Sequence, residues 1–527
     1  MTGKKIKKQK DYLILKEAQY KSIEWATEPV VAESLFREYD LRSPIWTLNK
    51  GGKAVLPGIN ADGIRVLGQA YGTYAQNVLK QKKIVIGNDY RSYSRGMAYA
   101  FMTGVMSTGV DVVDIGVVAT PTLYFAQYFL KFTGAAMITA SHNDNGWCGL
   151  KLAKGFSRTF EPDDIVTFKK SVYAGKFKRG SGKYERLDIN EAYIAEVVKR
   201  CKPYPCERKL KVVVSTANGG AGIFLPEVLK RLGFDIIKVN CDLDWDFPNF
   251  NPNTEDIKFL KQLGDAVKQH KADLGVGSDG DGDRFGVVNE EGHEIFSDRA
   301  GLFIARFISE QEKGKPIVID VKSTGAYLMD PVLKKNGITL TFSKTGHSYV
   351  KAKTREVNAL AGFERSGHFF LREPFGHGYD DACLSAALFC TILSRQKKLL
   401  SALIAEQPKS HQSPTMEPAV ENDKIKYEIV DKIIKEFDAM HRKGTPFAGR
   451  KIRELITVNG VRVVLEDGSS ALVRASSNSA VLVVVLESFS TRKLLYDLFD
   501  EVQSHLEKHG IRRENYDQLL PPYKGEE

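Results

Sequence analysis

Residues 274–288 read LGVGSDGDGDRFGVV, with three aspartates at alternate positions between two short apolar runs. The apolar runs predict two strands, and the acidic turn joins the end of the first to the start of the second. Alternate side chains of extended or tightly turned backbone point the same way, so Asp279, Asp281 and Asp283 should face one another. Three carboxylates on one side of a loop repel each other unless a cation lies between them. Such oxygen ligands favour Mg²⁺ or Ca²⁺.

Two other interpretations of this loop were weighed against a metal site. An EF-hand loop would place Glu290 at its twelfth position, but Arg284 stands where that loop needs glycine, and the flanks predict strands rather than helices. The second alternative is a solvated acidic turn. Gly280 and Gly282 favour the metal site, because glycine lets the backbone wrap tightly around an ion.

The composition indicates a cytoplasmic enzyme with an anionic ligand. The 527 residues are too many for one core, and the contents of 43% hydrophobic and 27% charged residues are typical of soluble globular proteins. The net charge of +11 comes from basic residues spread along the chain, which favours buried anion sites over a nucleic-acid surface. The six cysteines form no CxxC pair, and no apolar run reaches membrane-spanning length. We therefore expect reduced thiols and neither a nucleic-acid nor a membrane partner.

Strand and helix patterns predict a multidomain α/β protein. Three successive parts repeat the same strand–helix plan, and each ends in a polar loop. The fourth part differs, because it has a long helix near 422–441 and a hairpin turned at 467–468. The expected divisions are a basic extension at 1–33 and domains at 34–183, 184–294, 295–405 and 406–527. We expect the part after about residue 410 to act as a mobile lid.

The first polar loop contains Ser141, in a Thr-x-Ser-His-Asn turn after the strand expected at 135–138. A serine is a poor nucleophile unless a base, a metal or phosphorylation activates it. The alternative is a serine that caps the next helix.

Two later polar loops have the composition of a sugar-phosphate site. Glu364 and Ser366 can bind neighbouring sugar hydroxyls beside His368; the alternative is a buried capping glutamate with a core histidine. The last loop, RASSNS at 474–479, offers a guanidinium, hydroxyls, an amide and turn N–H groups, which suit a phosphate. A polar hairpin end is the alternative there.

Together these loops resemble those of the α-D-phosphohexomutases, and within that family the bacterial phosphomannomutase/phosphoglucomutase branch. Residues 139–143, 279–284, 363–368 and 474–479 follow the order and spacing of the family's four loops. FREYDLR at 36–42 and KTGHSYVK at 344–351 match two further segments, so that the likeness covers about residues 34–490. The resemblance implies an α/β fold of four domains around a central cleft, three with related mixed sheets and a C-terminal α+β domain.

The resemblance also implies an activity in carbohydrate metabolism. The enzyme would interconvert hexose 1-phosphate and hexose 6-phosphate, of mannose or glucose, through a phosphoserine and a hexose 1,6-bisphosphate. Mg²⁺ would be the cofactor and glucose 1,6-bisphosphate or an equivalent the activator. Phosphoglucosamine mutase is the nearest alternative, disfavoured by the last loop, and a metal-dependent sugar phosphatase is a second. A monomer or a small homo-oligomer is expected.

The site residues that the resemblance implies fall into three groups. The catalytic group is Ser141, His142, Lys151, Arg42, Arg284 and His368. The substrate-binding group is Tyr39, Lys322, His347, Glu364, Ser366, Arg474, Ser476, Asn478 and Ser479, and Arg299 matches a further substrate-facing position. The metal ligands are phosphorylated Ser141, Asp279, Asp281 and Asp283. Arg42, Lys151 and His368 stay open as alternatives for the group that moves the proton.

Overall fold

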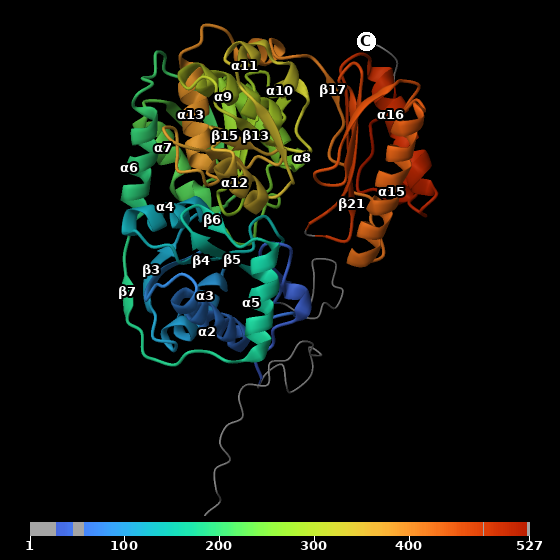
Figure 1. Ribbon diagram of the computed structural model, residues 1–527. Coiled ribbons are helices and arrows are strands. Elements are labelled where there is room, and N and C mark those ends of the chain that lie inside the picture. The colour runs from blue at the N-terminus through green and yellow to red at the C-terminus, as the bar shows by residue number, and fades with distance from the viewer. Residues whose placement is uncertain (1–27, 46–56, 478, 524–527) are drawn as a thin grey trace, which may run out of the picture. The chain divides into compact units, whose positions relative to one another are not determined.

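The computed structural model describes residues 28–45, 57–477 and 479–523 (Figure 1). The chain forms two compact units. The first extends to Val288 and takes up the chain again at Tyr379–Thr391, and the second comprises Asn289–Gly378 and the chain from Ile392 onward. Within the described ranges no helix is long and apolar enough to cross a membrane. Residues 1–27 of the expected basic extension lie outside these ranges.

The first sheet of the first unit is mixed and has the strand order β1-β5-β4-β2-β3-β7, with β6 beside β5. Its strands are β1 (Leu41–Pro44), β2 (Lys83–Asn88), β3 (Asp111–Val117), β4 (Ala135–Ile138), β5 (Trp147–Gly155), β6 (Arg158–Thr159) and β7 (Tyr184–Arg186). The accompanying helices are η1 (Glu33–Leu35), α2 (Ala61–Asn77), α3 (Ser94–Met106), α4 (Thr120–Leu130) and α5 (Pro162–Ala174). Strand β2 is parallel to β3 and β4, so their carboxyl ends reach the same edge of the sheet.

The second sheet is separate from the first and, within this unit, has the strand order β11-β10-β8-β9. Its strands are β8 (Lys211–Ser215), β9 (Asp235–Val239), β10 (Leu274–Ser278) and β11 (Phe285–Val288). The helices are α6 (Asn190–Cys201), η2 (Gly220–Ile223), α7 (Leu225–Arg231), α8 (Ile257–His270) and α13 (Ala382–Ser394), the last up to Thr391. Strands β10 and β11 are antiparallel and fully buried, which confirms the strand–loop–strand prediction for the acidic segment.

The second unit contains a mixed sheet with the order β14-β13-β15-β16. Its strands are β13 (Ile317–Asp320), β14 (Leu340–Ser343), β15 (Ala361–Phe363) and β16 (Phe369–Leu371), and β12 (Glu294–Ile295) precedes them. The helices are α9 (Ser297–Gln311), α10 (Ala326–Met329), α11 (Pro331–Lys335), α12 (His347–Glu356) and α14 (Leu400–Ala405). Strands β13, β14 and β15 are parallel, so the loops that follow them start at one edge.

The C-terminal part of the second unit is an antiparallel sheet with the order β17-β21-β20-β19-β18. Its strands are β17 (His411–Gln412), β18 (Ile452–Ile456), β19 (Val461–Leu465), β20 (Ser470–Ala475) and β21 (Leu482–Ser488). Helices α15 (Asp423–Lys443) and α16 (Arg492–Glu507) pack on this sheet side by side (Figure 1), and η3 (Arg513–Asn515) follows. The hairpin of β19 and β20 confirms the turn expected at 467–468.

Buried polar groups connect the two sheets of the second unit. Arg462 on β19 donates to the carbonyl oxygens of Val321, at 3.0 Å, and Ser323, at 2.6 Å. Glu487 on β21 accepts from the Gly325 N–H at 2.7 Å and from the Thr324 hydroxyl at 2.5 Å. Separating such groups would leave buried charges without partners, which is costly. These contacts oppose a movement of the C-terminal part, and its action as a mobile lid stays a prediction.

Candidate active site

Ser141 lies in the loop after β4, at the carboxyl edge of the first sheet. Its φ of 53° is in the left-handed region, an uncommon conformation for a residue with a Cβ. The Ser141 N–H donates to Thr139 Oγ1 at 2.8 Å, and Ser141 Oγ lies 3.2 Å from Nδ1 of His142. The element that follows is strand β5, so the alternative that Ser141 caps a helix is excluded.

Arg91 holds this loop in place and was not singled out in the sequence. Its guanidinium donates to the carbonyl oxygens of Ser141, Asn143 and Asp144 at 3.0, 2.6 and 3.0 Å, and forms an ion pair with Asp89 at 3.3 Å. The sequence signal was its place three residues after the end of β2, which predicts the edge of the sheet where it lies but not its partners. Because β2 and β4 are parallel, polar residues that follow both strands meet at the same edge.

The acidic loop between β10 and β11 presents its carboxylates inward. Asp279 Oδ1 accepts from the N–H groups of Asp283 and Arg284, both at 3.1 Å, which closes the turn. Asp279 Oδ2 and Asp281 Oδ1 are buried and accept no hydrogen bond. Asp279, Asp281 and Asp283 each offer an oxygen within 4.8 Å of the others. This buried, all-oxygen donor set fits a hard divalent cation such as Mg²⁺.

Lys151 on β5 partly neutralises the acidic loop. Its Nζ lies 2.7 Å from Asp281 Oδ2 and 2.5 Å from Asp283 Oδ2. Burial alone would lower the pKa of Lys151, but the two carboxylates outweigh it and raise that pKa well above its ordinary value. For Asp281, burial raises the pKa, but Lys151, the Thr120 hydroxyl and Arg42 together lower it by more, so the pKa falls below its usual range. Burial, Asp283 and Asp281 raise the pKa of Asp279 well above normal.

Close backbone packing joins the serine loop to the acidic loop. A Cβ on Gly280 would lie 2.7 Å from the carbonyl oxygen of Ser141, so a glycine is required at this position. Gly282 adopts φ of 82°, which also favours glycine. Thr120, at the start of α4, donates its hydroxyl to Asp281 Oδ2 at 2.7 Å, a contact that the sequence did not reveal.

Two predicted arginines border these loops. Arg42 follows the buried Tyr39 and donates to Asp40 Oδ2 at 2.8 Å and to Asn143 Oδ1 at 3.0 Å. Arg284 Nε lies 3.7 Å from Asp279 Oδ2. The first unit thus contains the catalytic residues predicted in its sequence near the three aspartates that are predicted to bind a metal.

The predicted sugar-binding loop, residues 363–368, lies at the carboxyl edge of β13, β14 and β15. Glu364 Oε2 accepts from the Ser366 hydroxyl at 3.1 Å, and Glu364 Oε1 is buried without a hydrogen-bond partner. Burial raises the pKa of Glu364 to about 7, although His368 opposes the shift. An acceptor of this kind suits a sugar hydroxyl.

His347 and Lys322 belong to the same edge. The rings of His347 and His368 are 5.8 Å apart, and Thr345 donates to Asp320 Oδ2 at 2.7 Å. Lys322 lies two residues after the end of β13 and is buried. His347 and His368 thus lie together, and Asp320, which the sequence did not indicate, holds Thr345 beside them. Their contact with substrate stays a prediction.

The last predicted loop begins at the end of β20, where the charged side chain of Arg474 is buried. Arg474 Nη1 donates to the carbonyl oxygen of Ala475 at 2.5 Å, and the Arg474 Nε is buried and has no hydrogen-bond acceptor. Ser476 is buried, and Lys426 on α15 donates to the Ser479 carbonyl oxygen at 2.9 Å, an approach not foreseen. Asn478 lies outside the described residues. An uncommitted guanidinium donor next to hydroxyls suits a phosphate.

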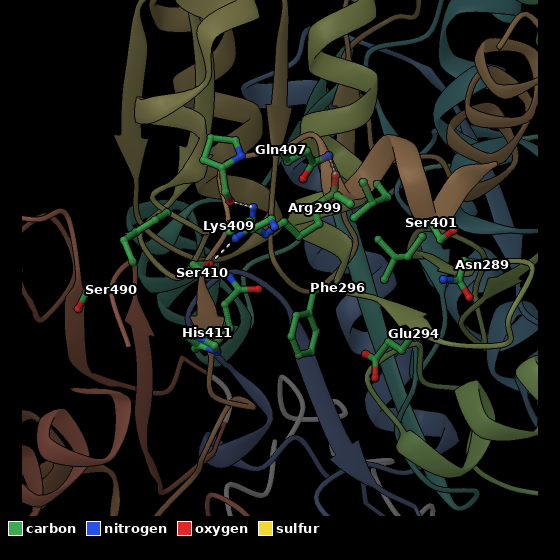
Figure 2. A pocket seen from close by; sticks show the side chains of 16 residues that line it. Asn289, Glu294, Phe296, Arg299, Ser401, Gln407, Lys409, Ser410, His411 and Ser490 are labelled. Atoms are coloured by element: carbon green, nitrogen blue, oxygen red, sulfur yellow. Dashed lines mark hydrogen bonds between the residues drawn. The ribbon is translucent and has the colours of Figure 1, made fainter. Parts of the chain in front are cut away.

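Arg299 is directed to the linker before the C-terminal sheet (Figure 2). Its guanidinium donates to the Pro408 carbonyl oxygen at 2.6 Å and to the Ser410 hydroxyl. Phe296, Gln407 and His411 line the same cavity of about 580 Å³. The structure therefore gives Arg299 a role in holding the linker, and its expected contact with substrate stays a prediction.

Comparison with known proteins agrees with this geometry. Models of the phosphoglucomutase/phosphomannomutase α/β/α domains I, II and III match residues 34–178, 191–292 and 296–411. A phosphomannomutase/phosphoglucomutase of Pseudomonas putida is 31% identical over 88% of this chain and 93% of its own. A phosphoglucomutase/phosphomannomutase of Thermococcus kodakarensis is 29% identical over 81% and 91%. The crystal structure of a phosphoglucomutase/phosphomannomutase family protein from Burkholderia thailandensis superposes with a TM-score of 0.79 at 29% identity, covering 91% of this chain and 98% of its own.

The fold and these relatives define a phosphotransferase enzyme with the four-domain α/β architecture expected from the sequence. The chain belongs to the phosphoglucomutase/phosphomannomutase family of phosphohexomutases.

Proposed function

We propose that this chain interconverts hexose 1-phosphate and hexose 6-phosphate through a phosphate carried on Ser141. The observation that carries the proposal is the contact between the left-handed Ser141 turn and Gly280 of the acidic loop. That contact is between the backbone of the Ser141 turn and the loop that carries the three buried aspartates, which supports a serine acting beside a metal site. The relatives named as phosphomannomutases and phosphoglucomutases support the same reaction.

The reaction requires two phosphoryl transfers. In the first, the Ser141 Oγ–phosphorus bond breaks as a bond forms to the free hydroxyl of a bound hexose monophosphate, giving a hexose 1,6-bisphosphate. After the intermediate turns over, its other phosphate returns to Ser141. Mg²⁺ bound by Asp279, Asp281 and Asp283 would offset the charge that moves. Arg284 orients the phosphoserine and His142 supports its oxygen, while Arg42, Lys151 and His368 are the candidates for holding the moving proton.

Recognition of the sugar falls to the second unit. Glu364 Oε1 and Ser366 would bind ring hydroxyls, with Lys322 and His347 beside them. Arg474, Ser476, Asn478 and Ser479 would bind the phosphate that is not transferred. Tyr39 would complete the substrate contacts. We infer a cytoplasmic enzyme, a monomer or small homo-oligomer without nucleic-acid or membrane partners, that is activated by glucose 1,6-bisphosphate.

A coupled assay tests the proposal. Purified protein should convert glucose 1-phosphate or mannose 1-phosphate to the 6-phosphate, faster with a trace of glucose 1,6-bisphosphate, and stop when Mg²⁺ is removed. Release of inorganic phosphate without isomerisation would instead indicate a phosphatase.

Intact mass supplies the second test, because excess hexose monophosphate should remove one phosphate from the protein. Ser141→Ala should abolish turnover. Ser157→Ala is the matched control, since Ser157 is a buried serine with φ of 50°, and it should keep turnover.

A further inference from the structure

Asp380 is a buried carboxylate beside the acidic loop that neither the motifs nor the reaction accounts for. It belongs to the segment Tyr379–Thr391, which packs in the first unit although the chain around it forms the second. The Ala382 N–H donates to the Gly282 carbonyl oxygen at 3.1 Å, which fixes this segment against the acidic loop. Asp380 is fully buried, and one of its oxygens lies within 4.8 Å of an oxygen of Asp283.

Metal binding creates a charge conflict at this place. Lys151 rests on Asp281 Oδ2 and Asp283 Oδ2, and all three side chains are buried. A divalent cation bound to the same aspartates would neutralise part of their negative charge. It would also bring two positive charges close to the ammonium group. In a low dielectric that repulsion is strong, and a buried ammonium needs a carboxylate partner.

Asp380 is placed to resolve the conflict. Lys151 Nζ lies 2.5 Å from Asp283 Oδ2, and an oxygen of Asp380 lies within 4.8 Å of an oxygen of Asp283, so a further buried carboxylate is close to the ammonium group.

We propose that Asp380 holds the Lys151 ammonium group when a divalent cation occupies Asp281 and Asp283. Asp380 is then a positioning residue, which holds the Lys151 ammonium group in place during phosphoryl transfer. This inference rests on the metal site of the proposed function.

A double-mutant cycle read out by metal affinity tests the inference without using activity. Mn²⁺ and Mg²⁺ are titrated calorimetrically into unphosphorylated full-length protein as wild type, Asp380→Asn, Lys151→Met and the double variant. Asp380→Asn should weaken metal binding at least tenfold when Lys151 is present, because the displaced ammonium then has no partner. In the Lys151→Met background the same substitution should have an effect at least tenfold smaller.

Asp381→Asn is the matched control. Asp381 is also buried, but its Oδ1 accepts from the Tyr193 hydroxyl at 2.8 Å and from the Leu384 N–H at 2.9 Å. It should leave metal affinity within twofold.

The outcomes separate this inference from the function on which it rests. Wild-type protein that binds neither Mn²⁺ nor Mg²⁺ would contradict the metal site itself. If the metal binds and Asp380→Asn weakens it equally in both backgrounds, Asp380 acts on the metal directly and the inference is overturned. No loss in the wild-type background overturns it as well. If Asp380→Asn does not fold, a crystal structure of Mg²⁺-loaded wild type decides: Lys151 Nζ should lie on Asp380, and a Lys151 that still bridges Asp281 and Asp283 refutes the handover.

Discussion

Gly280→Ala isolates the contact between the serine and acidic loops. The added Cβ would lie 2.7 Å from the Ser141 carbonyl oxygen, while an ordinary contact begins at 3.4 Å. The loops must therefore separate by 3.4 − 2.7, or 0.7 Å. Because a misplacement of about 1 Å can cost roughly 100-fold in rate, kcat should fall on the order of 10- to 100-fold. The overpacking should also destabilise the protein by about 1–3 kcal/mol.

The assay is the coupled conversion of glucose 1-phosphate, together with thermal unfolding. Gly96→Ala on α3 is the matched control, because a Cβ there meets no atom within 4 Å. It should keep kcat and gain about 0.5–1 kcal/mol of stability. If Gly280→Ala keeps kcat within twofold of wild type, contact between the two loops does not set the geometry of transfer.

Three further predictions concern charge. Because the pKa of Glu364 is raised from 4.5 to about 7 in the folded protein, the folded state holds this proton more tightly, and stability should fall by up to about 3 kcal/mol as the pH rises from about 4.5 through 7. Denaturation of Glu364→Gln should lack that fall, and parallel pH profiles of the two proteins would contradict the shift. Arg474→Ala should weaken substrate binding by about 1.5–3 kcal/mol, whereas the exposed Arg453→Ala should not; an unchanged KM in Arg474→Ala refutes the phosphate site. Asp281→Asn should lower both Mg²⁺ affinity and turnover by orders of magnitude, and activity that survives exhaustive chelation argues against the metal.

The turns and loops of the fold could be predicted from the sequence, because they depend on patterns of neighbouring residues. The acidic turn between β10 and β11 was evident from apolar runs and alternating aspartates, and the hairpin of β19 and β20 from Asp467 and Gly468. The serine loop was located for the same reason, since a buried strand ends just before it.

Long-range partners were not readable from the sequence. Arg91 lies 50 residues from Ser141 in the chain, and its hydrogen bonds go to backbone carbonyl groups, which any loop sequence provides. Thr120 looks like an ordinary residue at a helix start until the second sheet brings Asp281 to it. The resemblance to a known family supplied roles for residues, whereas only the packing shows that Gly280 needs to be glycine.

The return of the chain at Tyr379–Thr391 has a consequence for biosynthesis. The Phe389 ring lies 5.5 Å from that of Phe285, and Asp381 accepts from the Tyr193 hydroxyl, so α13 completes the core of the first unit. A ribosome that has released only the chain up to Val288 has not yet made this helix. The first unit should therefore stay incomplete, with apolar surface open to chaperones, until the intervening part of the second unit has also emerged.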